Sequence, residues 1–579
     1  MPGKIILKDV LKGYTLDQDK SIPPEETVRR FRERLQGLDL DILQGTARID
    51  NGRLDIPVFF SLCGRDARDT IGARKLMGKG GTPAQAEASA VMELAERFSL
   101  FSFRADPENF RVETYANLED HALPFEDIAR SVHDQSEDLP AVKEIFSSIP
   151  LRWTSAYNLT RDREVLIPFD WFYTINEYNG PSAGNCAEEA LLQGICEVVE
   201  RHVSSLVSRG GLRTPRILLD GLTDPLVREM LQKYGKAGVE LYINDLTLDT
   251  GIPSIGVLAY DPATFPEKSE IVWTAGTTPS PEKSLSRALT ETAQLAGDFN
   301  TSANYTASGL PKLLSLEQAG FVIDPGKEIG IQELPDISDP NLRAEVEGCL
   351  SALAGAGMEI LAVDITHPLL GVPSFYTIIP GAHFRQRAAG KSAGMFTARL
   401  IYDTTDPITA LGELQRMENL MPGKYYLRFY QGLCLLSLGE AEEALGYLGE
   451  ALDLDPEEED IPTVYSYMGQ CLKEMERYQE AASLLQEGLA MDSERTDLLN
   501  LLGFCLFKLG RHKEAIECFE ALLRLDPSSA IDYANIASNY RELGDRAAAV
   551  RYYRLALELD PGIEFARENL RRLEASAGD

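Results

Sequence analysis

Three segments of this chain carry glutamates at spacings that place side chains on one face of a helix. Side chains three, four and seven residues apart are neighbours on a helix surface. Each segment follows a glycine-containing turn, and its glutamates stand among small or apolar residues such as Ala88, Ile195 and Leu289. We therefore expect the carboxylates to border a core rather than open solvent. The glutamates are Glu93 and Glu96 in the first segment, Glu197 and Glu200 in the second, and Glu291 in the third.

Gathering these carboxylates in one place requires compensating positive charge. Two carboxylates about 6 Å apart repel by roughly 3 kcal/mol at an effective dielectric constant of about 20. Magnesium carrying a phosphate ligand is the natural partner for such a cluster. Arg97, Arg201 and Arg287 stand close to the glutamates in sequence and suit forked contacts with phosphate oxygens. The alternative is a set of separate solvated faces with Glu–Arg pairs, but three similar segments favour one shared site.

The turn before the first segment, Gly78-Lys79-Gly80-Gly81-Thr82, looks like a phosphate-binding loop. A P-loop needs a glycine, four further residues and then Gly-Lys-Ser/Thr. Here Ala73 occupies the place of the first glycine, and Lys79 is followed by Gly80. We therefore do not expect a P-loop NTPase, although the start of the following helix could present free amide groups to an anion.

Composition and charge exclude several functional classes. The chain has 579 residues and a formal net charge of −33, which argues against nonspecific binding to nucleic acid or to an anionic membrane. No apolar stretch is long enough to span a bilayer, and the N-terminal segment lacks the apolar run of a signal peptide, so we expect a cytoplasmic protein. The eight cysteines form no CxxC pair and the six histidines show no metal-ligand spacing. We therefore expect neither a disulfide framework nor a zinc or haem site.

The last third of the chain is a repeat array. Small residues recur at two positions twelve residues apart, and the last two repeats are 34 residues long. This pattern is the tetratricopeptide signature of paired helices with small residues where they cross. We expect an all-α tetratricopeptide solenoid of about four repeats over residues 424–579. The first marker position holds Gly432, Gly469, Gly503 and Ala537. A further position, suited to compact packing, holds Cys434, Cys471 and Cys505.

Residues 1–400 mix strand-like and helix-like patterns. Short runs of β-branched and aromatic residues predict strands, and longer periodic segments predict helices. We expect an α/β (α+β) domain in which sheet and helices enclose the glutamate stripes, followed by a linker over 401–423 with turn residues at both ends. The predicted strands are 57–62, 241–243, 254–260, 271–274, 360–363 and 375–379, and the predicted helices are 84–101, 187–208 and 281–296.

Residues 1–400 resemble the YcaO family. The resemblance rests on three separated motifs in the family's order and on the glycine-rich turn described above. The first motif is the Ser-x3-Glu-x2-Glu-Arg of 89–97. The second joins Ser182-Ala183-Gly184-Asn185-x3-Glu189 to the Glu-x2-Glu-Arg of 197–201. The third is Arg287-x3-Glu291-x2-Gln294.

Members of this family bind ATP and magnesium, so the resemblance implies a YcaO-type nucleotide-binding domain. It matches Lys20 and Thr27 to a Lys and a hydroxyl residue seven positions apart in bacterial members that do not form azoles. The implied magnesium ligands are Glu93, Glu96, Glu197, Glu200 and Glu291. The implied nucleotide contacts are Lys20, Thr27, Ser89, Arg97, Asn185, Glu189, Arg201 and Arg287. The implied catalytic residues are Glu197, Glu200 and Arg287.

The resemblance further implies an ATP- and magnesium-dependent enzyme that activates a backbone amide of a peptide or protein by phosphoryl transfer. The product would be a thioamide or an azoline, or the chain would be an accessory factor in ribosomal protein methylthiolation. The expected partners are a peptide or protein substrate, a TfuA-like protein or a methylthiotransferase on the repeats, and a second copy in a homodimer. We expect no nucleic-acid or membrane partner.

Two other functions stay open at this point. The chain could be a non-catalytic ATP-binding adaptor whose repeats hold a protein partner on their extended concave surface. ATP-grasp-like and amidoligase enzymes also use several acidic metal ligands, but the order of the motifs argues against them.

Overall fold

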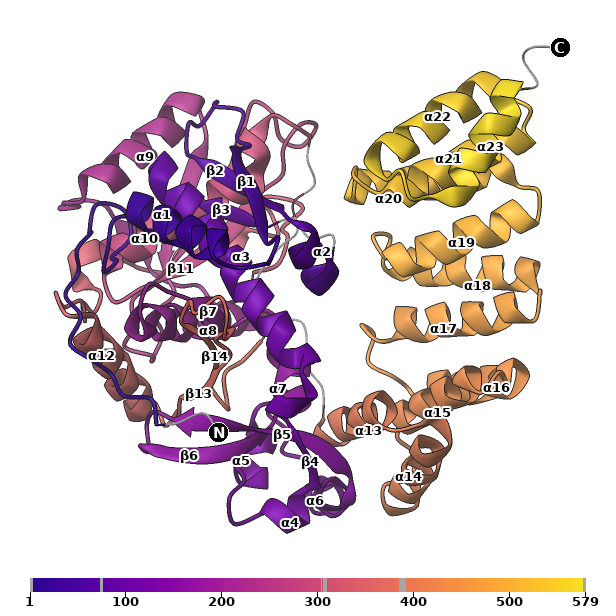
Figure 1. Cartoon of the computed structure of the whole chain (residues 1–579), viewed down its shortest axis with the longest axis horizontal. Coiled ribbons are helices and arrows are strands. Elements are labelled where there is room, and N and C mark those ends of the chain that lie inside the picture. Colours follow the sequence, from indigo (N-terminus) through magenta and orange to yellow (C-terminus); the bar gives the residue numbers. More distant parts are fainter. Residues whose placement is uncertain (1–3, 73–75, 303–304, 306–309, 385–391, 576–579) are drawn as a thin grey trace. The chain divides into compact units, whose positions relative to one another are not determined.

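The computed structural model describes residues 4–72, 76–302, 305, 310–384 and 392–575. The chain divides into two compact units (Figure 1). The first comprises Met1–Ser136 and Phe146–Ala393, and the second comprises Glu137–Ile145 and Gly394–Asp579. The first unit mixes helices and strands, whereas the described part of the second is helical. The predicted order of an α/β domain followed by an all-α region is confirmed.

The described residues of the first unit form three sheets, in which the strand pairs are antiparallel except for one. The first sheet has the order β1 (Leu43–Arg48), β2 (Val58–Cys63), β3 (Met77–Lys79). The second has the order β11 (Val272–Thr277), β10 (Ser254–Tyr260), β9 (Glu240–Asp245), β8 (Arg216–Leu218), β12 (Glu328–Gly330), with β8 and β12 parallel. The third has the order β4 (Arg111–Thr114), β5 (Pro150–Asn158), β13 (Leu361–Asp364), β14 (Ser374–Ile378), β7 (Pro181–Ala183), and β6 (Arg163–Pro168) also pairs with β5.

Each sheet carries one of the three glutamate helices. α3 (Pro83–Ala105) packs on the first sheet, α8 (Ala187–Gly210) on β7 and β14 of the third, and α10 (Pro281–Ala296) on β10 and β11 of the second. All three helices and all six strands predicted from the sequence are confirmed, with boundaries that differ by a few residues. The other helices before Ala393 are α1 (Pro24–Gln36), α2 (Arg65–Ile71), α4 (Tyr115–Leu118), α5 (Phe125–Arg130), α6 (Leu139–Ser148), α7 (Phe169–Asn176), α9 (Pro225–Ala237), α11 (Gly320–Ile323) and α12 (Leu342–Gly355).

Glycines in two strands let the glutamate helices approach their sheets closely. A Cβ atom at Gly78 would lie 2.0 Å from the backbone N of Ala90, and one at Gly276 would lie 2.3 Å from the carbonyl O of Ser284. At the equivalent position before α8, the hydroxyl of Ser182 donates a hydrogen bond to the helix backbone. Each of these strand residues stands fifteen positions before a glutamate of the cluster. The same close contact therefore sets the position of one glutamate on each helix.

The three glutamate helices also meet one another's sheets. α3 contacts β7, α8 contacts β11, and α10 contacts β3. Each helix therefore lies between its own sheet and the strand that leads into another of the three helices. This closed arrangement directs the three glutamate faces toward one centre.

The second unit is built from consecutive helix pairs. Within each pair the small marker residue lies where the helices cross: a Cβ atom at Gly469, for example, would lie 2.6 Å from a methyl carbon of Leu485. The helices from Ala393 onward are α13 (Ala393–Thr404), α14 (Pro407–Leu420), α15 (Tyr425–Ser437), α16 (Ala441–Asp453), α17 (Ile461–Glu474), α18 (Tyr478–Met491), α19 (Thr496–Lys508), α20 (His512–Leu525), α21 (Ala530–Glu542), α22 (Arg546–Leu559) and α23 (Glu564–Ala575). Within the described chain, every helix falls short of the length or the apolar character that a membrane span requires.

The repeat cysteines have the packing role that the sequence indicated. Cys434, Cys471 and Cys505 are free and fully buried, and burial raises the pKa of each thiol to about 11. In the last repeat this position holds Asn539, whose Oδ1 lies 3.0 Å from Nδ1 of His512. The position therefore selects a compact side chain rather than a reactive thiol.

The range predicted as a linker, 401–423, is largely helical. The predicted breaks are present, because Asp406 caps the start of α14 and Gly423 has a φ of +76° before α15. Between them α14 forms and buries an apolar face that includes Leu414 and Met417. The division into a catalytic domain over 1–400 and a repeat domain over 424–579 stays a prediction. The main boundary between the two compact units lies after Ala393.

Three histidines that are far apart in the sequence meet in the first unit. The rings of His133 and His383 stack with centroids 3.5 Å apart and planes within 2°. Nδ1 of His202 accepts a hydrogen bond from the backbone N–H of His383 (3.0 Å). Burial lowers the pKa of all three, to about 4 for His202 and to about 3 for His383. All three imidazoles are therefore neutral in the folded chain at neutral pH.

The close packing of strand glycines predicts a large difference between two glycine substitutions. We expect Gly276→Ala to lower the free energy of unfolding by at least about 2 kcal/mol, because the added methyl group overlaps backbone atoms. Gly235→Ala in α9 is the matched control, since a Cβ atom there meets nothing within 4 Å. That change should be neutral or stabilising by up to about 1 kcal/mol. Urea denaturation followed by circular dichroism measures both, and equal stabilities would contradict the close packing.

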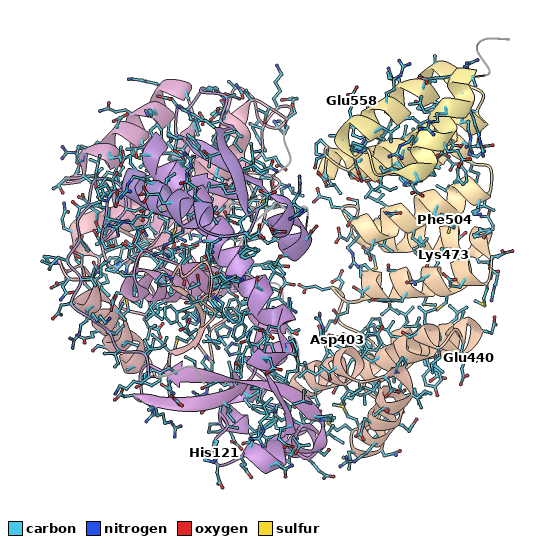
Figure 2. The ribbon with its side chains drawn as sticks, in the orientation of Figure 1. His121, Asp403, Glu440, Lys473, Phe504 and Glu558 are labelled. Atoms are coloured by element: carbon cyan, nitrogen blue, oxygen red, sulfur yellow. The ribbon has the colours of Figure 1, made fainter. Side chains whose placement is uncertain are left out.

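The histidine stack predicts loss of stability in acid. A histidine whose pKa is lowered on folding takes up a proton more readily in the unfolded chain, so acid favours unfolding below about pH 6.5. The melting temperature of the wild type should fall when the pH is lowered from 7.5 to 5. For His383→Asn we expect this fall to be smaller by about 2–4 °C. His121 is exposed (Figure 2), so His121→Asn should leave this pH dependence unchanged. Scanning fluorimetry at both pH values checks the result.

Candidate functional site

The site lies where the glutamate faces of α3, α8 and α10 meet. Lys79, the last residue of β3, forms an ion pair with Glu291 on α10. One turn earlier on α10, Arg287 donates from Nε to Oε2 of Glu200 on α8 (3.1 Å). Its Nη1 donates to Oε1 of Gln193, also on α8 (3.1 Å). These contacts join the first sheet, α8 and α10.

The Glu-x2-Glu-Arg motifs of α3 and α8 have the same local geometry. Arg97 lies 3.1 Å from Glu96 and 3.9 Å from Glu93. On α8 the corresponding distances from Arg201 to its two glutamates are 3.2 and 3.8 Å. An arginine one residue after the second glutamate and four after the first can reach both. Each helix therefore presents two carboxylates next to one guanidinium.

Two adjacent residues of one loop hold both arginines. Arg97 donates from Nη1 to the carbonyl O of Tyr178 (3.1 Å), and its guanidinium lies 5.2 Å from the centre of the Tyr178 ring. Arg201 donates from Nε to Oδ1 of Asn179 (2.9 Å). The loop that joins α7 to β7 therefore positions guanidiniums from two different helices.

The same loop contains an unfavourable backbone conformation. Glu177 has a φ of +46°, which is uncommon for a residue other than glycine. Its carbonyl O accepts a hydrogen bond from the hydroxyl of Tyr376 (3.3 Å). Gly180, with a φ of +95°, donates its N–H to Oε2 of Glu197 (3.1 Å). These contacts offset the local strain and fix the loop against the cluster.

The chain itself supplies much of the positive charge around the glutamates. Lys79, Arg97, Arg201 and Arg287 together face the five predicted magnesium ligands. Burial nevertheless raises the pKa of Glu93 and raises that of Glu96 more strongly. Burial, reinforced by the neighbouring Arg287 guanidinium, lowers the pKa of Lys79 to about 7. Five carboxylates thus face four cationic side chains, so a further cation would stabilise the ionised carboxylates.

The side chains present suit a magnesium-bound phosphate group. Carboxylates are the hard oxygen ligands that magnesium prefers, and guanidiniums bind phosphate oxygens. No three carboxylate, imidazole or thiol groups of the described residues already stand in a metal-binding arrangement. The carboxylates are instead paired with lysine and arginine side chains, so a metal ion would have to replace some of these cations to bind them.

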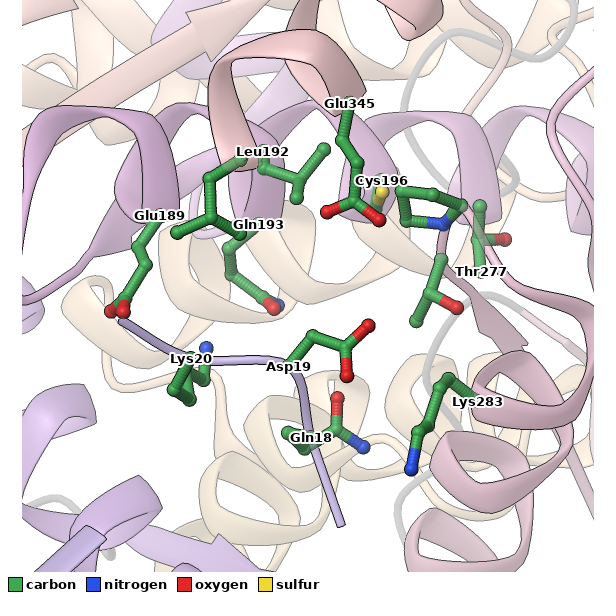
Figure 3. A pocket seen from close by; sticks show the side chains of 13 residues that line it. Gln18, Asp19, Lys20, Glu189, Leu192, Gln193, Cys196, Thr277, Lys283 and Glu345 are labelled. Carbon is green, nitrogen blue, oxygen red and sulfur yellow. The ribbon is translucent and has the colours of Figure 1, made fainter. Parts of the chain in front are cut away.

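A pocket adjoins the cluster through Gln193, which lines it and also accepts the hydrogen bond from Arg287. The empty space between its lining residues is about 450 Å³, which includes the part open to solvent. Figure 3 shows Glu189 and Gln193 extending from α8 toward Lys20 and Asp19 on the N-terminal segment. The lining residues are Gln18, Asp19, Lys20, Glu189, Leu192, Gln193, Cys196, Thr277, Thr278, Pro279, Lys283, Leu342 and Glu345.

The N-terminal segment is fastened beside this pocket by ion pairs. Lys12, whose side chain is 7% exposed, lies 2.7 Å from Asp19 and 2.6 Å from Glu345 on α12. The backbone N–H of Ser21 donates to Oε1 of Glu189 on α8. These contacts hold Gln18, Asp19 and Lys20, which form one wall of the pocket.

Asp17 occupies the anion position at the start of α3. Its Oδ2 accepts from the backbone N–H of Gly81 (2.5 Å) and Thr82 (3.2 Å), and its Oδ1 lies 3.5 Å from the hydroxyl of Ser286 on α10. Burial raises the pKa of Asp17 to about 6. The amide groups that could have bound an external anion are thus satisfied by a carboxylate of the chain itself.

The structure places most of the predicted site residues in or beside the cluster. Asn185 donates to Glu189 from its backbone N–H (2.9 Å) and from its side-chain amide (3.0 Å). Ser89 lies one turn before Glu93 on α3, just as Arg287 lies one turn before Glu291 on α10. The residues brought together in the cluster are Glu93, Glu96, Arg97, Glu197, Glu200, Arg201, Arg287 and Glu291, and those that line the pocket are Lys20 and Glu189.

Thr27 is placed differently from the other predicted residues. Its hydroxyl donates to the carbonyl O of Pro23 (3.4 Å) at the start of α1, and its side chain is buried. No hydrogen bond among the described residues links it to the cluster. Its nucleotide-binding role, like the roles assigned to the other site residues, stays a prediction.

Several residues of the site were not singled out from the sequence. Lys79 was considered only as a P-loop lysine, although its position directly before the first glutamate helix was a usable signal. Gln193 was also identifiable, because it stands four residues before Glu197 as Arg287 stands four before Glu291. Tyr178, Asn179 and Asp17 reach the site only through tertiary structure, and no spacing in the sequence indicates them.

The position of Asp17 predicts how the N-terminal segment is held. We expect Asp17→Ala to lower stability by about 1–3 kcal/mol, because it leaves the buried amides of Gly81 and Thr82 without an acceptor. Limited proteolysis should then cut residues 8–21 sooner than in the wild type. Lys8→Ala removes an exposed side chain from the same segment and is the control. Equal cleavage rates for the two variants would show that Asp17 does not hold this segment.

Comparison with known proteins agrees with this geometry. Residues 77–383 match the family model described as YcaO cyclodehydratase, ATP- and Mg2+-binding. Residues 406–459, 472–539 and 533–563 match tetratricopeptide repeat models, so the matched repeats begin within the range predicted as a linker.

Individual relatives cover the first unit for most of its length. A protein of Methanothermobacter thermautotrophicus is 30% identical over 388 residues, which are 62% of this chain and 94% of the relative. The ribosomal protein S12 methylthiotransferase accessory factor YcaO of Escherichia coli is 28% identical over 262 residues, 41% of this chain and 43% of that protein. The structure of YcaO from Methanopyrus kandleri bound with AMPPCP and Mg2+ aligns with a TM-score of 0.50 at 24% identity, covering 65% of this chain and 95% of that one. The chain belongs to the YcaO cyclodehydratase family, which binds ATP and Mg2+, and it continues into a tetratricopeptide repeat region.

Proposed function

We propose that this chain is an ATP- and magnesium-dependent enzyme that activates a backbone amide of a peptide or protein. A nucleophile adds to the amide carbonyl carbon, and the oxygen of the adduct takes the γ-phosphoryl group of ATP, which releases ADP. The oxygen then departs as phosphate while the carbon keeps its bond to the nucleophile. Loss of a proton from the nucleophile or from the amide nitrogen forms the new double bond to that carbon. The observation that carries this proposal is the buried cluster of glutamates and guanidiniums at the meeting point of α3, α8 and α10.

The arginines of the cluster are suited to phosphoryl transfer. That reaction needs charge neutralisation and alignment more than a protein nucleophile. Arg287 is held by Glu200 and Gln193, and Arg201 is held by Asn179. Guanidiniums oriented in this way before substrate arrives would neutralise charge on the phosphate oxygens with little rearrangement.

The nucleotide and metal would divide between the pocket and the cluster. Magnesium would supply Lewis-acid stabilisation of the phosphate oxygens, held by Glu93, Glu96, Glu197, Glu200 and Glu291. Lys20 and Glu189 in the pocket, Asn185 beside Glu189, and Ser89 and Arg97 on α3 would contact the nucleotide. Thr27 would join them only after a rearrangement at the start of α1.

The repeat region supports a protein substrate or partner. Tetratricopeptide arrays present extended surfaces that bind other chains, and the E. coli relative is named as an accessory factor of a methylthiotransferase. We propose a thioamide- or azoline-type modification, or an accessory role in ribosomal protein methylthiolation, as the outcome of amide activation. A TfuA-like protein or a methylthiotransferase would bind the repeats, in the cytoplasm, with the chain as a homodimer.

Calorimetric titration of the full chain with ATP tests the proposal. We expect binding that depends on magnesium and that Glu197→Ala weakens at least about tenfold, equivalent to roughly 1.4 kcal/mol, because the metal loses a carboxylate ligand. Glu33→Ala is the control, since Glu33 is exposed and, among the described residues, pairs only with Arg29 on the surface of α1. Its affinity for ATP should equal that of the wild type.

Two results would contradict the enzyme. Unchanged ATP affinity in Glu197→Ala would place the nucleotide outside the cluster. Normal binding without ATP hydrolysis in the presence of any candidate peptide would favour the alternative of a non-catalytic ATP-binding adaptor, which the repeat region also supports.

A further inference from the structure

A series of aromatic and guanidinium contacts leads away from the cluster along α3. The guanidinium of Arg97 lies 5.2 Å from the centre of the Tyr178 ring. That ring meets the ring of Tyr173 edge-on, with centroids 6.3 Å apart and planes at 86°. The guanidinium of Arg104 lies 3.5 Å from the centre of the Tyr173 ring. All four residues, which we call the α3 strip, are partly exposed.

The two ends of the α3 strip differ in charge compensation. Arg97 faces Glu93 and Glu96, as described above. Arg104 has no carboxylate within ion-pair distance among the described residues, and its Nε is buried without a hydrogen-bond partner. Glu177 lies close enough to influence the Tyr173 hydroxyl but forms no ion pair with Arg104. In a chain with a net charge of −33, this guanidinium is left for an external anion.

The spacing of the α3 strip matches a short stretch of peptide. Arg97 and Arg104 are seven residues apart on α3, so they share one face about 10 Å apart. An extended peptide covers roughly 3.3–3.6 Å per residue. About three peptide residues would therefore span from the cluster to Arg104.

We propose that the α3 strip binds the peptide substrate and that Arg104 pairs with a carboxylate about three residues from the reacting amide. The inference rests on the proposed function, because the cluster is taken as the place of reaction. A planar guanidinium binds carboxylates through paired hydrogen bonds. Tyr173 and Tyr178, which are partly exposed residues, could offer a bound peptide the apolar contact that aromatic side chains provide at interfaces. The carboxylate is that of an aspartate, a glutamate or the peptide's C-terminus.

Selection from a peptide library tests this subsite without knowledge of the natural substrate. The probe is a synthetic dodecapeptide library randomised over nineteen amino acids, without cysteine, and the peptides retained by the full chain are sequenced by mass spectrometry. We expect the wild type to enrich peptides with aspartate or glutamate about threefold, as for a half-exposed ion pair. Arg104→Gln should remove this enrichment, and Arg104→Lys, which keeps the charge, should restore part of it.

The matched control uses a second arginine beside an aromatic ring. The guanidinium of Arg428 lies 5.2 Å from the centre of the Tyr447 ring, but it is already paired with Glu418. The double variant R428Q/E418Q removes a compensated guanidinium and leaves the local charge unchanged. It should enrich acidic peptides as the wild type does.

Calorimetry with ATP on the same variants separates the subsite from the proposed function. The proposal predicts normal ATP affinity for Arg104→Gln and Arg104→Lys, because Arg104 lies two helical turns from the cluster. Normal ATP binding without acidic enrichment by the wild type would overturn the subsite and leave the enzyme proposal intact, however the variants fold. Persistent enrichment in a folded Arg104→Gln would also overturn it. Acidic enrichment that depends on Arg104 in a chain that fails to bind ATP would support the subsite and contradict the enzyme proposal.

Discussion

The first unit depends on the joint burial of like-charged carboxylates with the cations that offset them. Removing a charged group from water is costly, and placing several glutamates together adds repulsion, so the cluster is stable only with partners in position. Lys79 and the three arginines meet this need from four different elements, β3, α3, α8 and α10. Charge balance is incomplete, because four cationic side chains face five carboxylates. One more cation would therefore stabilise the cluster.

Backbone packing, rather than side-chain flexibility, determines where the charges lie. Gly78 and Gly276 bring two helices onto their strands at distances that no larger residue allows. The contacts of α3 with β7, α8 with β11 and α10 with β3 then close the three layers on one another. The N-terminal segment adds Asp17 at the start of α3, which links this turn to α10 through Ser286. The glutamates lie close together because each stands on a helix whose distance from its sheet is fixed by close packing.

The sequence was sufficient for the local parts of this arrangement. Strands, the three long helices and the repeat array follow from periodicity, and the converging glutamates follow from their regular spacing on the helices. Helix α14 was missed because turn residues at both ends outweighed its short apolar face. The histidine stack and the contacts of Asp17, Tyr178 and Asn179 join residues far apart in sequence, so no local pattern contains them. Lys79 carries a local signal, because it stands directly before α3, but the glycines around it also resemble a P-loop.

The loop between α7 and β7 has a consequence for how this fold can vary. Tyr178 and Asn179 are consecutive, and one holds the arginine of α3 while the other holds the arginine of α8. Inserting or deleting a single residue next to Tyr178 or Asn179 would shift one of these two residues relative to the other. At least one of the two arginines would then lose its contact with the loop. The length of this loop is thus as strongly constrained as the identity of the acidic residues, although neither of its two contact residues carries a charge.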